Sequence, residues 1–105
     1  MGADARAVAT GALIAAACQQ YRICGSGHCP VGIATQDPAL RARLKVEEAA
    51  QRVANYLTVS NEELKTFARI SGVSDIHELT LQNLITLDED IAKYTGIAHA
   101  GAGRI

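Results

Sequence analysis

The chain has 105 residues and a formal net charge of −1, a length that suits one small domain with a single core. The charge balance shows no basic excess, so neither nucleic acid nor an anionic membrane surface is predicted as a partner. No run of about 18 apolar residues occurs, so no transmembrane helix is predicted. The apolar stretch Ala12–Ala17 is short and lacks a positively charged leader, so we expect no signal peptide and a cytoplasmic location.

Aromatic residues are scarce, with one phenylalanine, three tyrosines and no tryptophan. Alanine supplies much of the apolar content, and each alanine buries little surface. A core built from this composition is expected to be thin. The composition therefore predicts a chain that is completed by a cofactor, a partner or a neighbouring domain.

Residues 2–17, GADARAVATGALIAAA, allow two interpretations. Alanine and leucine dominate, which favours a helix throughout. Alternatively, the Thr10-Gly11 pair marks a turn between a short strand and a helix that begins near Gly11. Such a junction presents backbone N–H groups that can hold a phosphate, although the single turn glycine also fits an ordinary packing segment.

The loop of residues 18–37 holds all three cysteines, with the spacing Cys18-x5-Cys24-x4-Cys29. An odd number of cysteines leaves one thiol over in any disulfide framework. Three closely spaced cysteines in an unexported chain fit metal or iron–sulfur ligation better. The three glycines of this loop are expected to let the backbone close on a bound cluster: Gly25, Gly27 and Gly32.

Other interpretations of the loop remain open. A zinc ion bound by the three cysteines and His28 is one, although His28 is adjacent to Cys29 and the spacing is wider than in usual zinc knuckles. Three reduced cysteines acting as small apolar filler are another. A nucleophilic cysteine would need an orienting base, and no pattern places His28, His77 or His99 beside a chosen cysteine.

Residues 38–96 are predicted to be helical. Asp37-Pro38 supplies an N-cap and a proline at the first helical position, and this helix is expected to reach about Leu44. Its basic residues indicate either a solvated face or a docking patch: Arg41, Arg43 and Lys45.

Residues 46–71 carry the longest periodic pattern. Apolar positions recur from Val46 to Phe67 in steps of four and three, which predicts one face of a helix. Ser60 lies within this stripe and also opens a capping-box pattern, so two shorter helices are the alternative. We expect one long helix, because the register continues through the polar patch, with Gly72 as its C-terminal stop.

Three short helical segments are expected to follow. Ser74 is predicted to cap the first and Thr80 the second. The third opens with the capping-box pattern of residues 86–89 and ends before Gly96. Residues 97–105 are rich in glycine and alanine, and they are expected to form a flexible or linker tail.

The run CGSGHCPVGIATQDPALRARL resembles the FMN-binding synthase domain of glutamate synthase. That family has a cysteine loop ending in a CPVG(V/I)ATQDP motif, followed by an arginine-rich helix. The downstream run EEAAQRVANYLTVSNEELKTFARISGVSDIHELTLQNLITL resembles the archaeal-type members. Arg6 and Ala9 depart from the family pattern, which has an apolar residue and a glycine there.

The resemblance implies a mainly α chain that is the C-terminal fragment of a (β/α)8 FMN-binding barrel. Residues 1–17 would be a remnant of the last barrel strand and helix. The implied ligands of a three-iron, four-sulfur cluster are Cys18, Cys24 and Cys29, with a four-iron cluster or zinc less favoured. Thr10 and Gly11 would contact FMN only in the context of the full barrel.

The function implied by the resemblance is electron transfer within glutamate synthase, an oxidoreductase of glutamate biosynthesis. That enzyme makes glutamate from 2-oxoglutarate and glutamine-derived ammonia. The implied partners are the rest of the barrel or other synthase subunits, and an electron donor such as ferredoxin or a nicotinamide-dependent subunit. The chain alone is not expected to be catalytic, since it shows no acid–base constellation. The alternatives are a cofactor-free helical interaction or oligomerisation module and a small zinc-binding domain.

Overall fold

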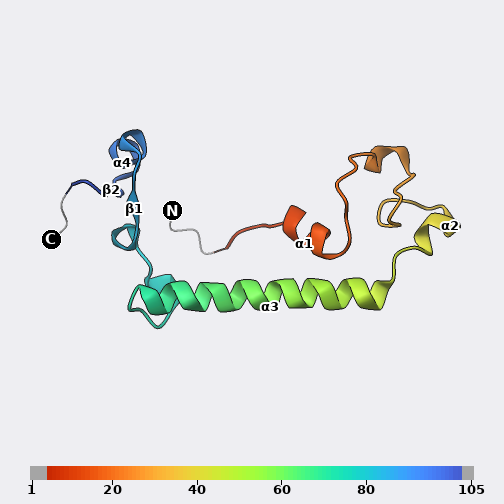
Figure 1. The fold of residues 1–105 in the computed structure, drawn as a ribbon, viewed down its shortest axis with the longest axis horizontal. Coiled ribbons are helices and arrows are strands. Elements are labelled where there is room, and N and C mark those ends of the chain that lie inside the picture. Colours follow the sequence, from red (N-terminus) through yellow and green to blue (C-terminus); the bar gives the residue numbers. More distant parts are fainter. Residues whose placement is uncertain (1–4, 103–105) are drawn as a thin grey trace. The chain divides into compact units, whose positions relative to one another are not determined.

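The structure is a computed structural model, which describes residues 5–102. These residues are mainly helical, as expected, and Figure 1 follows the elements along the chain. The elements are α1 (Thr10–Ala15), η1 (Cys24–Ser26), α2 (Pro38–Arg41), α3 (Val46–Ile70), η2 (Ile76–Glu78), η3 (Leu81–Asn83), β1 (Ile85–Thr86), α4 (Glu89–Thr95) and β2 (Ala98–His99). The chain divides into two compact units. Residues 7–61 form one, and the other contains residues 5–6 and 62–102 of the described chain.

The N-terminal segment forms only the short helix α1, which begins at Thr10. Residues 5–9 adopt no strand, and residues 1–4 lie outside the described residues. A barrel strand is held by hydrogen bonds to its neighbours in the sheet, and residues 5–9 have no such neighbour among the described residues. The strand expected before Thr10 is therefore not formed here.

The end of α1 sets where the cysteine loop begins. The Cys18 N–H donates to the Leu13 carbonyl at 2.9 Å, which is the long closing bond of a Schellman motif. Ala17 occupies the position that usually carries glycine, with φ of 99°. This hydrogen bond fixes the backbone of Cys18 relative to α1.

Helix α2 begins as the sequence predicts. The Asp37 carboxylate accepts hydrogen bonds from the N–H groups of Ala39, at 2.8 Å, and Leu40, at 3.2 Å. The helix ends at Arg41, before the expected Leu44, and a turn follows.

Helix α3 runs unbroken from Val46 to Ile70, so the prediction of one long helix is confirmed. The polar patch does not interrupt it, and the Thr58 hydroxyl donates back to the Ala54 carbonyl at 2.8 Å. Gly72 stops the helix with φ of 74°, and the Val73 N–H closes the end by donating to the Ala68 carbonyl at 3.0 Å. No helix among residues 5–102 is long and apolar enough to cross a membrane.

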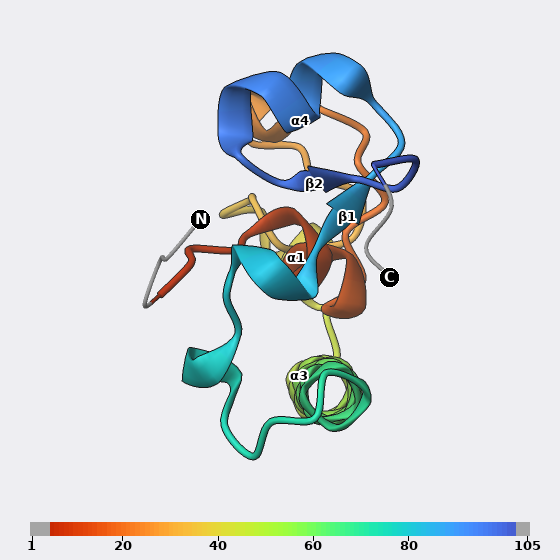
Figure 2. The ribbon, with the colours of Figure 1, turned by 90° about the vertical axis from the view of Figure 1, so that its left-hand side faces the viewer.

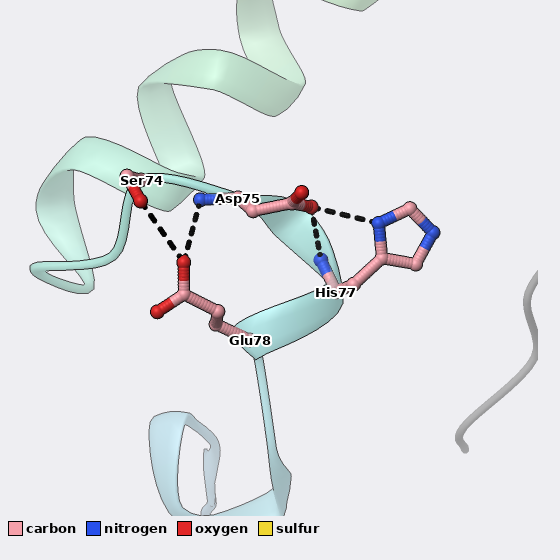
Figure 3. A network of polar contacts seen from close by, with 4 residues as sticks. All are labelled: Ser74, Asp75, His77 and Glu78. Atoms are coloured by element: carbon pink, nitrogen blue, oxygen red, sulfur yellow. Dashed lines mark hydrogen bonds and ion pairs between the residues drawn. The ribbon is translucent and has the colours of Figure 1, made fainter.

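The predicted caps of the later segments are partly shifted. Thr80 caps η3 as expected, whereas Asp75 rather than Ser74 caps η2. The Ser74 hydroxyl and the Asp75 N–H instead donate to the Glu78 carboxylate, as Figure 3 shows. Likewise Asp88 caps α4, because its carboxylate accepts from the Ile91 N–H at 2.9 Å. In both cases an aspartate is the N-cap residue, where the sequence predicts a nearby serine or threonine.

Part of the segment expected to be a flexible or linker tail forms a short strand, and residues 103–105 lie outside the described residues. Ala98 and His99 pair in parallel with Ile85 and Thr86, and α4 connects the two strands. Figure 2 shows α4 beside the strands. Ile97 is 6% exposed, so it contributes to the thin core that these elements share. Burial of this apolar side chain and the β1–β2 pairing give the segment an ordered position.

Few side chains are buried within the described residues. The buried set is Cys29, Thr35, Ala49, Ala68 and Ile97, and no large side chain is fully buried. The thin core predicted from the alanine content is therefore confirmed. Cys29, Thr35 and Ala49 all belong to the unit that carries the cysteine loop.

Candidate functional site

The cysteine loop and the start of α1 line an open cavity of about 260 Å³. All three cysteines line it: Cys18, Cys24 and Cys29. Thr10 lines the same cavity, and Ile23 and Val31 add apolar wall. The structure thus brings together the three predicted ligands, although nine other residues separate them along the chain.

Cys18 is half-buried at one end of the loop. The Gln20 backbone N–H donates to the Cys18 sulfur at 3.4 Å. Gln20 reaches this position with φ of 57°, in the left-handed region that favours glycine. Arg22 has a similar φ of 59°. Sequence analysis missed both residues, because neither glutamine nor arginine signals a left-handed backbone.

Cys24 is exposed and begins the single turn η1. Gly27 ends that turn with φ of 72°, and its N–H donates to the Cys24 carbonyl at 3.2 Å. The left-handed glycine reverses the chain, so that Cys29 returns to the cavity. An added Cβ at Gly25 or Gly27 would have no atom within 4 Å. The predicted role of these glycines, closure of the backbone on a bound cluster, stays a prediction.

Cys29 is the most buried of the three cysteines, with 8% of its surface exposed. The pKa of the Cys29 thiol is lowered, mainly by the backbone N–H of Ala34. Burial acts in the opposite direction and raises this pKa. The backbone N–H groups of Val31, Ile33 and Gly32 lower it further. Successive N–H groups around one sulfur form a concave anion site. The loop after Cys29 therefore favours the thiolate, which is the form that binds metals.

Residues 28–37 hold this arrangement together. His28 and Thr35 form an isolated antiparallel bridge, and the buried Thr35 hydroxyl accepts from the Asp37 N–H at 3.1 Å. Arg43 also contacts the loop, donating from Nη1 to the Pro30 carbonyl at 3.1 Å. These contacts tie the segment that follows Cys29 to helix α2.

His28, considered above as a fourth ligand, makes its ring contact within the loop. Its Nδ1 lies 2.7 Å from the Ser26 carbonyl oxygen, and the residue does not line the cysteine cavity. Among residues 5–102, no three histidine, cysteine or acidic side chains converge closely enough to hold a single metal ion. An iron–sulfur cluster distributes its cysteines over several iron atoms and does not require such convergence.

The other two histidines belong to the other unit. His77 Nδ1 lies 2.7 Å from the Asp75 carboxylate, and His99 Nε2 lies 3.2 Å from the Leu87 carbonyl oxygen. Within the unit that carries the cysteine loop, the one histidine is His28, and it does not line the cysteine cavity.

The two residues predicted to contact a flavin phosphate have different surroundings. Thr10 faces the cysteine cavity. Gly11 instead packs against Tyr56 of α3, where an added Cβ would collide with the tyrosine hydroxyl. In this chain Gly11 therefore permits the close approach of α1 to α3.

A family model described as a conserved region in glutamate synthase matches residues 1–74. The chain belongs to the glutamate synthase family. The match includes the whole cysteine loop and α2, and it continues through α3. The family predicted from the CPVGIATQDP motif is thereby confirmed.

Three relatives show the extent of this similarity. The archaeal-type glutamate synthase [NADPH] of Thermotoga maritima is 38% identical over 105 residues, covering 96% of this chain and 21% of the relative. The archaeal glutamate synthase [NADPH] of Methanocaldococcus jannaschii is 39% identical over 79 residues, covering 75% and 16%. A glutamate synthase large subunit-like protein of Rhizobium meliloti is 35% identical over 117 residues, covering 96% and 26%.

The chain spans between 16% and 26% of the length of these relatives. It corresponds to one part of a larger glutamate synthase. No solved structure matches it significantly.

Proposed function

We propose that this chain is the electron-transfer portion of a glutamate synthase, with an iron–sulfur cluster held by Cys18, Cys24 and Cys29. The observation that carries the proposal is that all three thiols line one cavity. Three cysteine ligands suit a three-iron, four-sulfur cluster, and a bound cluster supplies one-electron transfer.

The chemistry of the cavity fits such a group. Cysteine thiolates are the usual ligands of iron–sulfur clusters. The Gln20 backbone N–H donates to the Cys18 sulfur, and the backbone N–H groups of residues 31–34 lower the pKa of the Cys29 thiol. Hydrogen bonds to the sulfurs raise the reduction potential, because they stabilise the more negative reduced state.

FMN is proposed as the second redox group, bound only when the remainder of the (β/α)8 barrel is present. Within this chain, Thr10 is the residue proposed to contact the flavin phosphate, and it lines the cysteine cavity. A barrel of this type needs about 250 residues, so most flavin and substrate contacts must come from outside this chain. The proposed partners are that remainder or other synthase subunits, and an electron donor such as ferredoxin or a nicotinamide-dependent subunit.

The proposal is tested by purifying the chain without oxygen and measuring its ultraviolet–visible spectrum, iron and acid-labile sulfide on one sample. We expect broad brown absorbance with iron and sulfide in nearly equal amounts, and paramagnetic resonance would then count the irons. A colourless sample free of iron, even after reconstitution with ferrous iron and sulfide, would contradict the proposal.

Two variants separate the cluster from zinc. Cys24→Ser removes a proposed ligand, so it should abolish the colour and the iron. His28→Gln is the matched control, since His28 does not line the cavity, and it should leave iron and sulfide unchanged. Zinc in place of iron, lost on His28→Gln, would instead indicate a Cys3His zinc site.

A second candidate function is a cofactor-free interaction or oligomerisation module. Helix α3 exposes large apolar side chains along its predicted stripe, including Leu57 at 51%, Leu64 at 46% and Phe67 at 61%. Exposed apolar surface of this kind often marks an interface. Sedimentation analysis tests it: a dimer that Phe67→Ser dissociates and Tyr94→Ser does not would support this function, and a monomer at all concentrations would contradict self-association.

A further inference from the structure

A second cavity, of about 280 Å³, adjoins the cysteine cavity. Gln19 and Val31 line both cavities and so form the wall between them. Its lining is basic. Three cations surround it, Arg43, Lys45 and Arg52, together with one carboxylate, Glu48. All belong to the same compact unit.

The cations are placed in different ways. Arg43 donates one N–H to the Pro30 carbonyl at 3.1 Å, which anchors the guanidinium and leaves its other donors for a ligand. Arg52 pairs with Glu48 at 3.5 Å, and both side chains are more than half exposed, so this pair is weak. Lys45 Nζ has no acceptor among residues 5–102.

We infer that this cavity binds a small dianion that carries phosphate or carboxylate groups. Three positive side chains and one negative side chain give the lining a net charge of +2, which a dianion would neutralise. Arginine forks match the geometry of both phosphate and carboxylate oxygens. The volume lies at the lower end of small-molecule sites, so a compact ligand is favoured over a polymer.

The site would adjoin the proposed cluster without depending on it. Because Gln19 and Val31 line both cavities, a dianion bound here would lie next to the loop that carries the cysteines. The inference goes beyond the proposed function, since none of its four charged residues is a proposed cluster ligand. Iron and sulfide content therefore test the cluster, and anion binding tests this cavity.

The experiment is isothermal titration calorimetry of the full 105-residue chain with inorganic phosphate and, separately, with succinate, at low and constant ionic strength. Sodium chloride of matched ionic strength provides the blank. We expect saturable heat with one site per chain, weakened by added salt. Saturable binding of either dianion supports the inference, and the tighter one identifies the ligand class.

Charge-removing variants locate the site. Lys45→Gln and Arg43→Gln should each weaken binding by roughly three- to tenfold. Lys45→Gln breaks no side-chain hydrogen bond or ion pair among the described residues, so it still tests the site if Arg43→Gln unfolds the loop. Glu48→Gln should tighten binding by a similar factor, because it removes the competing carboxylate and frees Arg52.

Lys65→Gln is the control, because Lys65 lies elsewhere on α3 in an exposed pair with Glu62. It should leave the affinity unchanged. Heat no greater than that of the chloride blank with both dianions would overturn the inference. Equal losses for Lys65→Gln and Lys45→Gln, or weaker binding by Glu48→Gln, would overturn it as well.

Discussion

Gly32 packs so closely against Leu40 that a Cβ added to the glycine would lie 2.5 Å from the Leu40 carbonyl oxygen and 3.1 Å from the Leu44 nitrogen. The backbone of Gly32 also has φ of 86°, which side chains rarely allow. This contact seats the loop after Cys29 on the end of α2. It is therefore part of what holds the backbone N–H groups around the Cys29 sulfur.

Gly32→Ala is expected to lower the free energy of unfolding by about 2–3 kcal/mol, because it adds both a steric clash and an unfavourable φ. Gly25→Ala is the matched control in the same loop, since a Cβ there meets no atom within 4 Å. Urea unfolding followed by circular dichroism measures both. Equal effects of the two substitutions would show that the Leu40 contact is unimportant.

Ala17→Gly is expected to raise the free energy of unfolding by about 0.5–1 kcal/mol, because alanine stands at φ of 99° in the cap of α1. The neighbouring Ala16 has φ of −72°, where alanine is unstrained. Ala16→Gly should therefore destabilise by a few tenths to about 1 kcal/mol. Thermal unfolding of both variants gives the comparison, and a loss of stability in Ala17→Gly would contradict the observed cap.

Asp37→Ala is expected to cost about 1 kcal/mol of stability, because two N–H groups of α2 lose the carboxylate that accepts their hydrogen bonds. Asp37→Asn should retain most of the stability, since an amide oxygen also caps helices well. Denaturant unfolding at neutral pH distinguishes the two. Identical losses would mean that the charge of Asp37, rather than its hydrogen bonds, stabilises α2.

Asp75 is expected to make the chain less stable in acid. The His77 backbone N–H, and then the His77 ring, lower the pKa of Asp75 below its ordinary value of 3.8 by hydrogen bonding to the carboxylate (Figure 3). A carboxyl group whose pKa is lower in the folded chain stabilises it above the unfolded value. That stabilisation is lost as the pH falls through the lower, folded value.

Carboxyl-carbon nuclear magnetic resonance should place the Asp75 titration below pH 3.8. His77→Ala removes the ring and keeps the backbone N–H, so it should raise the Asp75 pKa only part of the way towards its ordinary value. Full return to that value in His77→Ala would assign the whole effect to the ring. Asp75→Asn should remove this part of the acid dependence of stability.

The later elements show the limit of local signals. Thr80, Gly72 and Gly96 mark helix ends in the sequence and do so in the structure. Ser74 and Thr86 also fit capping patterns, yet Asp75 and Asp88 cap the helices. Several polar side chains near a helix start can each accept the free N–H groups, so the final geometry decides between them.

The sequence by itself determined the family, from the CPVGIATQDP motif, and the long helix α3, from its apolar period. Both depend on neighbours close along the chain, where spacing alone carries the information. Only the tertiary structure decided that the three thiols line one cavity, that Gln20 takes a left-handed backbone, and that Ala98 pairs with Ile85. Those features require residues distant in sequence, or a backbone conformation that the residue type does not favour, and so they arise only when the chain packs.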